Sequence, residues 1–176
     1  MSASRWSIDP AHSSVSFSVR HMMFAKVRGR FATLSGTIAL DEESLGASTV
    51  EVEIDVASID TNAPDRDKHL RSPDFFDVEK FPKLTFKSTK VEPHGQRLRV
   101  TGTLTMHGVS KDVTLEAERT GAGKDPWGNQ RQGFAARGAV ERKQFGLKWN
   151  QTLEAGGVLV GDKIEIELDV QALPAK

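Results

Sequence analysis

The sequence contains no cysteine, and this absence excludes disulfide bonds, thiol catalysis and cysteine-based zinc sites. It also has no excess of either charge, because 24 Lys and Arg residues balance 24 Asp and Glu residues. Net charge therefore does not direct the protein toward nucleic acid or toward an anionic membrane. No apolar run approaches the ~18 residues that a membrane-spanning helix requires.

The N-terminal sequence MSASRWSIDPAHS lacks the basic start and apolar core of a secretory signal. We therefore expect a cytoplasmic protein from the sequence as written, and a periplasmic or secreted one only if a signal has been removed. The length of 176 residues predicts a single domain over residues 1–176, which is large enough to bury most of its apolar surface.

Alternation of apolar and polar residues dominates the chain and is typical of strands that bury one face. The segment TVEVEIDV, residues 49–56, is the clearest example. The apolar positions predict eight strands: 15–19, 27–40, 50–56, 84–86, 98–106, 113–117, 134–140 and 164–170. In the second of these, the apolar positions change from odd to even numbers near Thr33, which predicts a bulge or a bend there.

Eight strands with one apolar face each predict an all-β fold. An antiparallel barrel hides one face of its sheet and removes the sheet edges. Eight is also the strand number at which the interior is either filled by side chains or able to hold one ligand. We therefore expect an extended eight-stranded antiparallel barrel.

The stretch RDKHLRSPDFFD, residues 66–77, does not alternate. Thr61 or Asn62 could cap a helix that has Pro64 in its first turn, and Ser72 could cap a second helix that starts at Pro73. These signals predict a short helical insertion between the third and fourth strands. We expect its charged side chains to face water.

Several residues in this region have side chains that can perform catalysis or bind a metal. Asp65, Asp67 and His69 have a metal-like spacing in a strand, but in a helix only Asp65 and His69 share a face. Helix-dipole carboxylates and a histidine at the mouth are the favoured interpretation. The sequence also lacks a G-x-S-x-G motif and a complete phosphate-binding loop. We therefore predict no catalytic residue and no metal.

Two apolar clusters lie outside the alternating segments. Met22, Met23 and Phe24 follow the first strand, and a second cluster of Leu70, Phe75 and Phe76 lies in the insertion. Both clusters could plug the barrel core. They could equally form an apolar mouth, where flexible methionines and paired aromatic rings adapt to a lipid-like ligand.

Four segments carry a resemblance to a known family: WSIDPAHSSVSFSVRHMMFAKVRGRF, SIDTNAPDRDKHLRSPDFFDVEKFPKLTF, GTLTMHGVSKDVTL, and RKQFGLKWN followed by LVGDKIEIELD. In this order they resemble the YceI-like family of lipocalin-like polyisoprenoid-binding proteins over nearly the whole chain. The resemblance implies an elongated barrel whose apolar pore holds an isoprenoid chain, such as a polyprenyl phosphate or a quinone tail. It also implies no established catalytic residues and frequently a homodimer.

The resulting prediction is a non-catalytic carrier of an isoprenoid lipid. The alternatives are an enzyme that acts on such a lipid at the mouth, with His21, Asp67, His69 and Asp77 as candidates, and a ligand-free stress-response module. The predicted ligand-binding residues form four groups. They are the lid residues Leu70, Phe75 and Phe76; the rim residues Met22, Met23 and Phe24; the wall residues Phe17, Phe31, Phe86, Leu104, Met106, Phe134 and Trp149; and the polar mouth residues Arg20, His21, Arg66 and His69.

Overall fold

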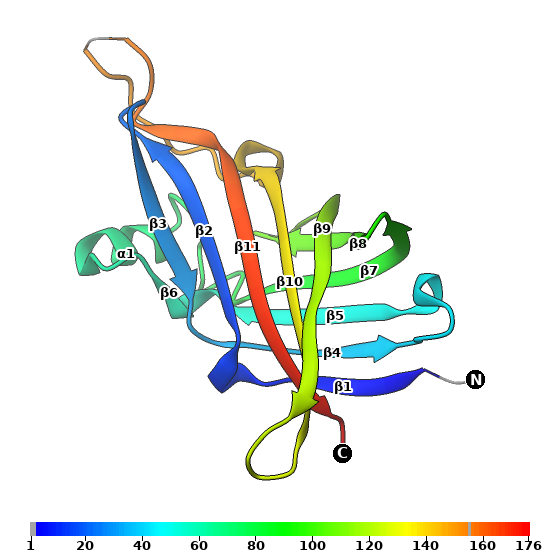
Figure 1. The fold of residues 1–176 in the computed structure, drawn as a ribbon. Helices are drawn as coiled ribbons and strands as arrows, with labels where there is room; N and C mark the ends of the chain where they lie inside the picture. The colour runs from blue at the N-terminus through cyan, green and yellow to red at the C-terminus, as the bar shows by residue number, and fades with distance from the viewer. Residues whose placement is uncertain (1–2, 155) are drawn as a thin grey trace.

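A computed structural model describes residues 3–154 and 156–176, and its strands form one antiparallel sheet (Figure 1). The strands are β1 (Ser4–Ile8), β2 (Ser14–His21), β3 (Ala25–Phe31), β4 (Leu34–Leu40), β5 (Thr49–Asp55), β6 (Ile59–Asp60), β7 (Lys83–His94), β8 (Arg97–Met106), β9 (Val109–Lys124), β10 (Gln130–Glu141) and β11 (Val160–Pro174). One α-helix, α1 (Pro64–Arg71), and four short 3-10 segments complete the described elements. The 3-10 segments are η1 (Pro10–His12), η2 (Leu45–Ala47), η3 (Val56–Ser58) and η4 (Arg142–Phe145).

The sheet closes into a barrel in the order β1-β4-β5-β7-β8-β9-β10-β11, because β11 also pairs with β1. Strand β11 pairs with β1 near its end and with β2 over its first part, so β1 and β2 follow one path that η1 interrupts. Strands β3 and β4 likewise form one path. With these two pairs counted as continuous strands, and with the two-residue β6 set aside because it pairs only with β3, the predicted eight-stranded antiparallel barrel is confirmed.

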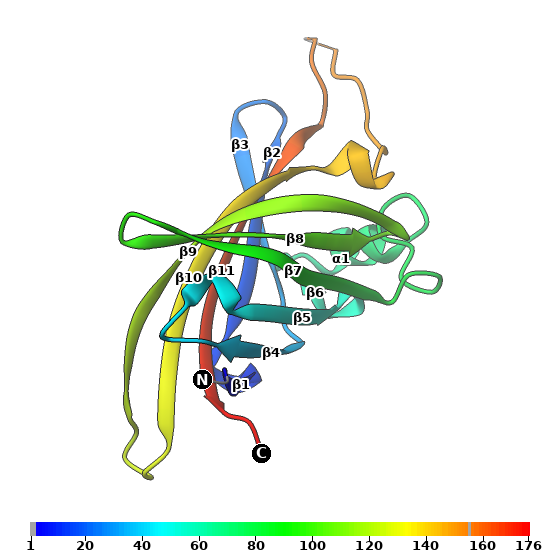
Figure 2. The same cartoon turned by 90° about the vertical axis from the view of Figure 1, so that its right-hand side faces the viewer.

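The bend predicted near Thr33 is present. Strand β3 ends at Phe31 and β4 begins at Leu34, and this break allows apolar residues of both parities to point inward. Strand β3 pairs with β2, whereas β4 pairs with β1 and β5. Figure 2 shows how the two halves diverge, so that the β2–β3 hairpin leaves the barrel at one end.

Alternation places the apolar positions on the inner face of the barrel. On β5, Val52 and Ile54 are buried while Glu51 and Glu53 are exposed. The buried side chains form one continuous apolar cluster, to which the partly buried Leu70 and Phe76 of the insertion are added. The insertion therefore belongs to the same apolar interior as the strands.

The structure corrects three predictions of local structure. Strands β1 and β6 were not predicted. The predicted caps of the first helix are wrong, because α1 begins after Ala63, and neither Thr61 nor Asn62 caps it. The predicted second helix is also wrong, because the segment after Ser72 forms turns. In these turns the backbone N–H groups of residues 75–78 donate to the carbonyls of Leu70, Arg71 and Ser72 at 3.0 to 3.1 Å.

Helix α1 lies between β5 and β7 in sequence, as predicted for the insertion. It contains eight residues, and within the described chain no helix is long and apolar enough to cross a membrane.

Candidate functional site: an apolar cavity under a helical lid

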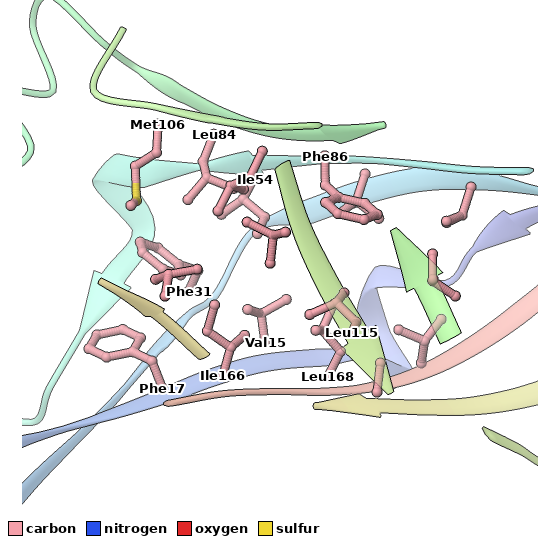
Figure 3. Close-up of a pocket in the computed structure, with 18 of the residues that line it drawn as sticks. Val15, Phe17, Phe31, Ile54, Leu84, Phe86, Met106, Leu115, Ile166 and Leu168 are labelled. Atoms are coloured by element: carbon pink, nitrogen blue, oxygen red, sulfur yellow. The ribbon is translucent and has the colours of Figure 1, made fainter. Parts of the chain in front are cut away.

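An apolar cavity of about 260 Å³ lies inside the barrel. Figure 3 shows its opposite walls, with Leu84 and Phe86 of β7 on one side and Ile166 and Leu168 of β11 on the other. The lining residues come from most of the strands, and all of them are apolar except Ser48, Thr49 and Arg142. The side chains at the inward-facing positions of the alternating strands form this wall.

Nine residues of the predicted site lie in the cavity wall. They are Phe17, Phe31, Leu70, Phe75, Phe76, Phe86, Leu104, Met106 and Phe134. Three of these rings form a continuous row, because Phe31 lies 5.5 Å from Phe17 and 6.0 Å from Phe76 between ring centroids. The row connects two barrel strands with the insertion. The role of the nine residues in ligand binding stays a prediction.

Three inward-facing glycines keep large side chains flat against the wall. A Cβ atom on Gly102 would lie 2.5 Å from the Phe86 ring, and one on Gly138 would lie 2.5 Å from Leu115. A Cβ atom on Gly29 would likewise lie 2.4 Å from the Phe17 ring. Glycine in a strand interior commonly marks such a close approach. The space that each missing side chain leaves is taken by a neighbour, and the centre of the barrel remains open.

We call α1 and the turns of residues 72–77 the lid, because Leu70, Phe75 and Phe76 add apolar side chains to the cavity wall from outside the strands. Phe75 is buried, and Leu70 and Phe76 are half-buried. Asp65, Arg66, Lys68 and Asp74 of the lid are exposed, as predicted. The apolar residues therefore face the barrel while most of the charged residues face water.

Asp67 is the exception, and the prediction that it faces water is wrong. Its side chain is buried and accepts hydrogen bonds from the backbone N–H of Thr61, at 2.9 Å, and from the Thr61 hydroxyl. A buried carboxylate needs such partners, because an unsatisfied one costs several kcal/mol. Asp67 therefore fastens the helix to the chain that precedes it.

Two arginines complete the attachment of the lid. The Arg66 guanidinium donates to the Thr61 hydroxyl at 2.7 Å and to the Thr61 carbonyl at 2.6 Å. The Arg71 guanidinium donates to the carbonyls of Ala57 and Ile59, each at 3.0 Å. Arg66 was predicted to contact a ligand head group, but the structure places its hydrogen bonds on the backbone and hydroxyl of Thr61.

His69, which belongs to the lid, and Trp149 both lie outside the cavity wall. The His69 ring is 5.1 Å from Phe75 and 4.7 Å from Trp149, and Phe75 is 5.3 Å from Trp149. The imidazole Nε2 of His69 is 2.9 Å from an oxygen of Asp74. These contacts hold Phe75 in place from its outer side.

The predicted rim residues lie at the turn between β2 and β3. Met22, Met23 and Phe24 are 40%, 53% and 79% exposed, and they lie outside the cavity wall. Arg20 and His21 precede this turn at the end of β2 and also lie outside the wall. Val19 and Val160 line the cavity, and Val160 pairs with His21, so the turn lies close to one end of the cavity.

Arg142 is the charged residue of the wall. It was not predicted, because no local sequence pattern indicates a buried arginine. It is 2% exposed and donates to the carbonyls of Gly161, Leu147 and Trp149 at 2.7 to 2.9 Å, and to Val160 at 3.3 Å. Burial lowers the pKa of this guanidinium, and the carboxylate of Asp162 partly opposes that effect.

The acid–base candidates do not form a common centre. Asp67 bonds to Thr61, whereas His69 faces Asp74 and Trp149. Over residues 3–154 and 156–176, no three His, Asp or Glu side chains are grouped so that they could hold a metal ion. The apolar cavity is therefore the feature on which a functional proposal can rest.

In a comparison with protein families, residues 6–172 fit the model of the YceI-like domain. Protein YceI from Salmonella newport is 41% identical over 165 residues, which are 94% of this chain and 83% of that protein. A UPF0312 protein from Vibrio parahaemolyticus is 47% identical over 138 residues, which are 78% of this chain and 73% of that one.

Solved structures share the fold. BcnA from Burkholderia cenocepacia has a TM-score of 0.82 and 25% identity, with 93% of this chain and 98% of that one covered. The YceI protein of Campylobacter jejuni has a TM-score of 0.74 and 33% identity, with 89% and 90% covered. A polyisoprenoid-binding domain from Saccharophagus degradans has a TM-score of 0.71 at 16% identity, with 98% and 99% covered, and shows the fold alone.

Proposed function

Because the chain belongs to the YceI-like domain family, and because its barrel encloses an apolar cavity, we propose that it binds and carries a long-chain isoprenoid lipid without changing it chemically. The proposed ligand is a polyprenyl phosphate or an isoprenoid quinone. The observation that supports this most strongly is the composition of the cavity wall, in which only Ser48, Thr49 and Arg142 are polar.

The extent of the cavity wall favours a linear ligand. A volume of about 260 Å³ is slightly below the range of ~300–1,000 Å³ that is usual for ligand pockets. Residues from strands on all sides of the barrel and from the lid nevertheless contact it. A thin hydrocarbon chain can contact more of such an extended wall than a compact molecule of the same volume can.

The tail can supply the affinity. Burial of a methylene-sized group contributes ~0.8 kcal/mol, so three isoprene units contribute on the order of 10 kcal/mol before the ordering costs of binding are subtracted. This gross contribution comes from contact with the apolar wall. No strong interaction with the head group is needed.

The positions of the cations agree with a tail-dominated interaction. An arginine has five N–H donors, and Arg142 directs four of them to backbone carbonyls. Arg66 directs two of its donors to Thr61. Neither guanidinium is arranged as a bidentate clamp for a phosphate. We therefore infer that the head group makes loose contacts at one end of the cavity.

The absence of chemical change is inferred from where the reactive groups lie. General acid–base catalysis requires a side chain within hydrogen-bonding reach of the reacting group. Asp67 and His69 are engaged with Thr61 and Asp74 behind the apolar face of the lid. The name of the Saccharophagus domain, which shares this fold, is in keeping with a binding protein.

Mass spectrometry of the protein as it is purified from its expression host tests the proposal. We expect a co-purifying long-chain isoprenoid that is released only when the protein unfolds. A stoichiometric metal together with turnover of an added isoprenoid would indicate an enzyme instead. Protein that carries neither and fails to bind an added isoprenoid would indicate a ligand-free module.

A further inference from the structure

The turn between β2 and β3 exposes more apolar surface than its local structure explains. We call Met22, Met23 and Phe24 the β2–β3 tip. Phe24 is 79% exposed, and the tip projects from one end of the barrel beside residues 156–159 (Figures 1 and 2). A contiguous exposed apolar group of this kind commonly marks a surface that contacts a partner or a membrane.

The backbone of the tip is held in an unfavourable conformation. Met22 and Met23 have φ angles of 53° and 69°, in the left-handed region where glycine or asparagine is usual. The neighbouring segment holds them there, because the Met22 N–H donates to the Leu159 carbonyl at 2.8 Å and Gly157 lies against the Met23 side chain. Methionine at these positions is therefore not explained by the requirements of the turn.

The cations behind the tip add a second unfavourable feature. Arg20 lies directly opposite Lys26, and Arg28 lies one outward-facing pair further from the tip. Like charges that face each other across two strands are destabilising. Lys26 is 3.4 Å from Glu165, whereas Arg20 and Arg28 have no ion-pair partner among the residues that the structure describes. The strained backbone of the tip and the facing cations behind it both destabilise the fold locally. Two such features at one place indicate that the place is retained for a function.

We propose that the β2–β3 tip docks the protein on the surface of a bilayer that contains anionic lipids. Met23 and Phe24 enter the boundary between head groups and acyl chains, and Arg20, Lys26 and Arg28 contact the head groups. The spacing fits, because strand residues advance ~3.3 Å each and the Arg20–Lys26 pair therefore lies roughly 7 Å behind the tip. Amphipathic elements bury their apolar face ~5–10 Å into this boundary.

A second copy of the chain is a less suitable occupant. The three side chains of the tip can bury only on the order of 300 Å², whereas a stable interface buries ~800 Å² on each partner. Glu154, on the neighbouring segment, is exposed and sets a limit on how strongly anionic lipids attract this end.

Docking would bring the cavity close to the membrane. Val160 lines the cavity and pairs with His21, which immediately precedes the tip. This inference goes beyond the proposed ligand, because docking on lipid head groups does not require an occupied cavity. Loss of docking and loss of cavity binding are therefore separate results.

The test is co-sedimentation with vesicles of phosphatidylcholine that contain 30% phosphatidylglycerol. The tip variant Met23→Asn/Phe24→Ser removes apolar surface, and asparagine suits the left-handed conformation, so folding should be retained. We expect its vesicle partition coefficient to fall at least tenfold. The control is Trp127→Ser, which removes an aromatic residue that is 80% exposed on the β9–β10 turn, and its partition coefficient should stay within twofold of the wild type.

A second variant, Arg20→Gln/Arg28→Gln, should lose the preference for phosphatidylglycerol vesicles over pure phosphatidylcholine vesicles. Melting temperatures of all variants establish that they are folded. The proposal is overturned if the wild type does not bind the anionic vesicles or if the tip variant binds them as the wild type does. A wild-type dimer in sedimentation velocity that the tip variant lacks would also overturn it, because the tip would then be a contact between copies.

Discussion

The ring of Phe17 lies across Gly29 on the neighbouring strand, at a distance that leaves no room for a side chain. The two residues are direct partners in the β2–β3 pairing, and a Cβ atom on Gly29 would lie 2.4 Å from the ring. The ring therefore occupies the place of the missing side chain and lies along the wall. Phe17 contributes apolar surface to the cavity without filling it.

The substitution Gly29→Ala should force the Phe17 ring away from the wall and into the cavity. Strain of this kind costs ~1–3 kcal/mol, and the lower chain entropy of alanine offsets roughly 0.5–1 kcal/mol of it. We expect a net loss of about 1–2 kcal/mol in the free energy of unfolding and weaker retention of the lipid. Gly121→Ala is the control, since a Cβ atom on Gly121 has no neighbour within 4 Å. Equal urea midpoints for the two variants would contradict the prediction.

The lid should bind the tail through its apolar face. Phe76 lines the cavity, so Phe76→Asp places a carboxylate against the lipid and should strip most of the ligand from the purified protein. Arg66→Ala removes only contacts with Thr61 and should leave most of the lipid bound. Lipid content is compared by mass spectrometry at matched melting temperature. If the arginine variant loses the lipid and the aspartate variant keeps it, the assignment of lid and cavity is wrong.

Asp67 should contribute to stability through its bonds to Thr61. The variant Asp67→Ala leaves a buried N–H and a buried hydroxyl without their acceptor, which costs ~1–3 kcal/mol. Asp65→Ala, at an exposed position of the same helix, should change stability by less than ~0.5 kcal/mol. Chemical unfolding of both variants measures the difference. A loss of the same size in both would mean that Asp67 acts only through the helix dipole.

Arg131 should make the protein sensitive to acid. Its guanidinium bonds to Asp9 and Asp125, each at 2.8 Å. Burial opposes ionisation of Asp125, but hydrogen bonds from Asn129, Arg131 and Trp127 outweigh it and lower its pKa to about 2. The hydrogen bond from Arg131 is also the main reason that the pKa of Asp9 is lowered.

A lowered pKa means that the unfolded chain takes up protons first as the pH falls. The stability that these carboxylates contribute is complete above about pH 4, and it is lost as the pH falls toward 2. In Arg131→Gln, the free energy of unfolding should depend less on pH over this window. Urea unfolding at several pH values measures the slope, and Arg137→Gln, at an exposed position, is the control. An unchanged slope in Arg131→Gln would assign the acid sensitivity to other groups.

Much of the barrel could be predicted because inward and outward positions alternate in any strand, whatever its neighbours. The change of parity near Thr33 was enough to locate the bend between β3 and β4. Strand β1 was missed because Ser4–Ile8 is short and contains only two apolar residues. Pro64 correctly indicated the start of α1, since proline is favoured in the first turn of a helix.

The site was predicted less completely, because its parts come from distant segments. Residues on strands, such as Phe31 and Phe86, line the cavity, and their role in binding stays a prediction. Met22, Met23 and Phe24 lie in a turn, where no periodicity distinguishes the interior from solvent, and the structure places them on the surface. The burial of Asp67 depends on Thr61, and that of Arg142 on carbonyls up to 19 residues away.

The closure of the barrel has a consequence for how the chain folds. Strand β11 pairs with β10, β2 and β1, and its pairing with β1 places Pro174 opposite Trp6. Until residues 160–174 are in place, β10 and β1 remain open edges, and the β2–β3 hairpin has no partner on the β11 side. Pairings between such distant residues carry a high loop-closure cost, and they are slow to form. We expect the pairing of β11 to be the slow, committing step of folding, and the preceding open sheet to be the species most prone to aggregate.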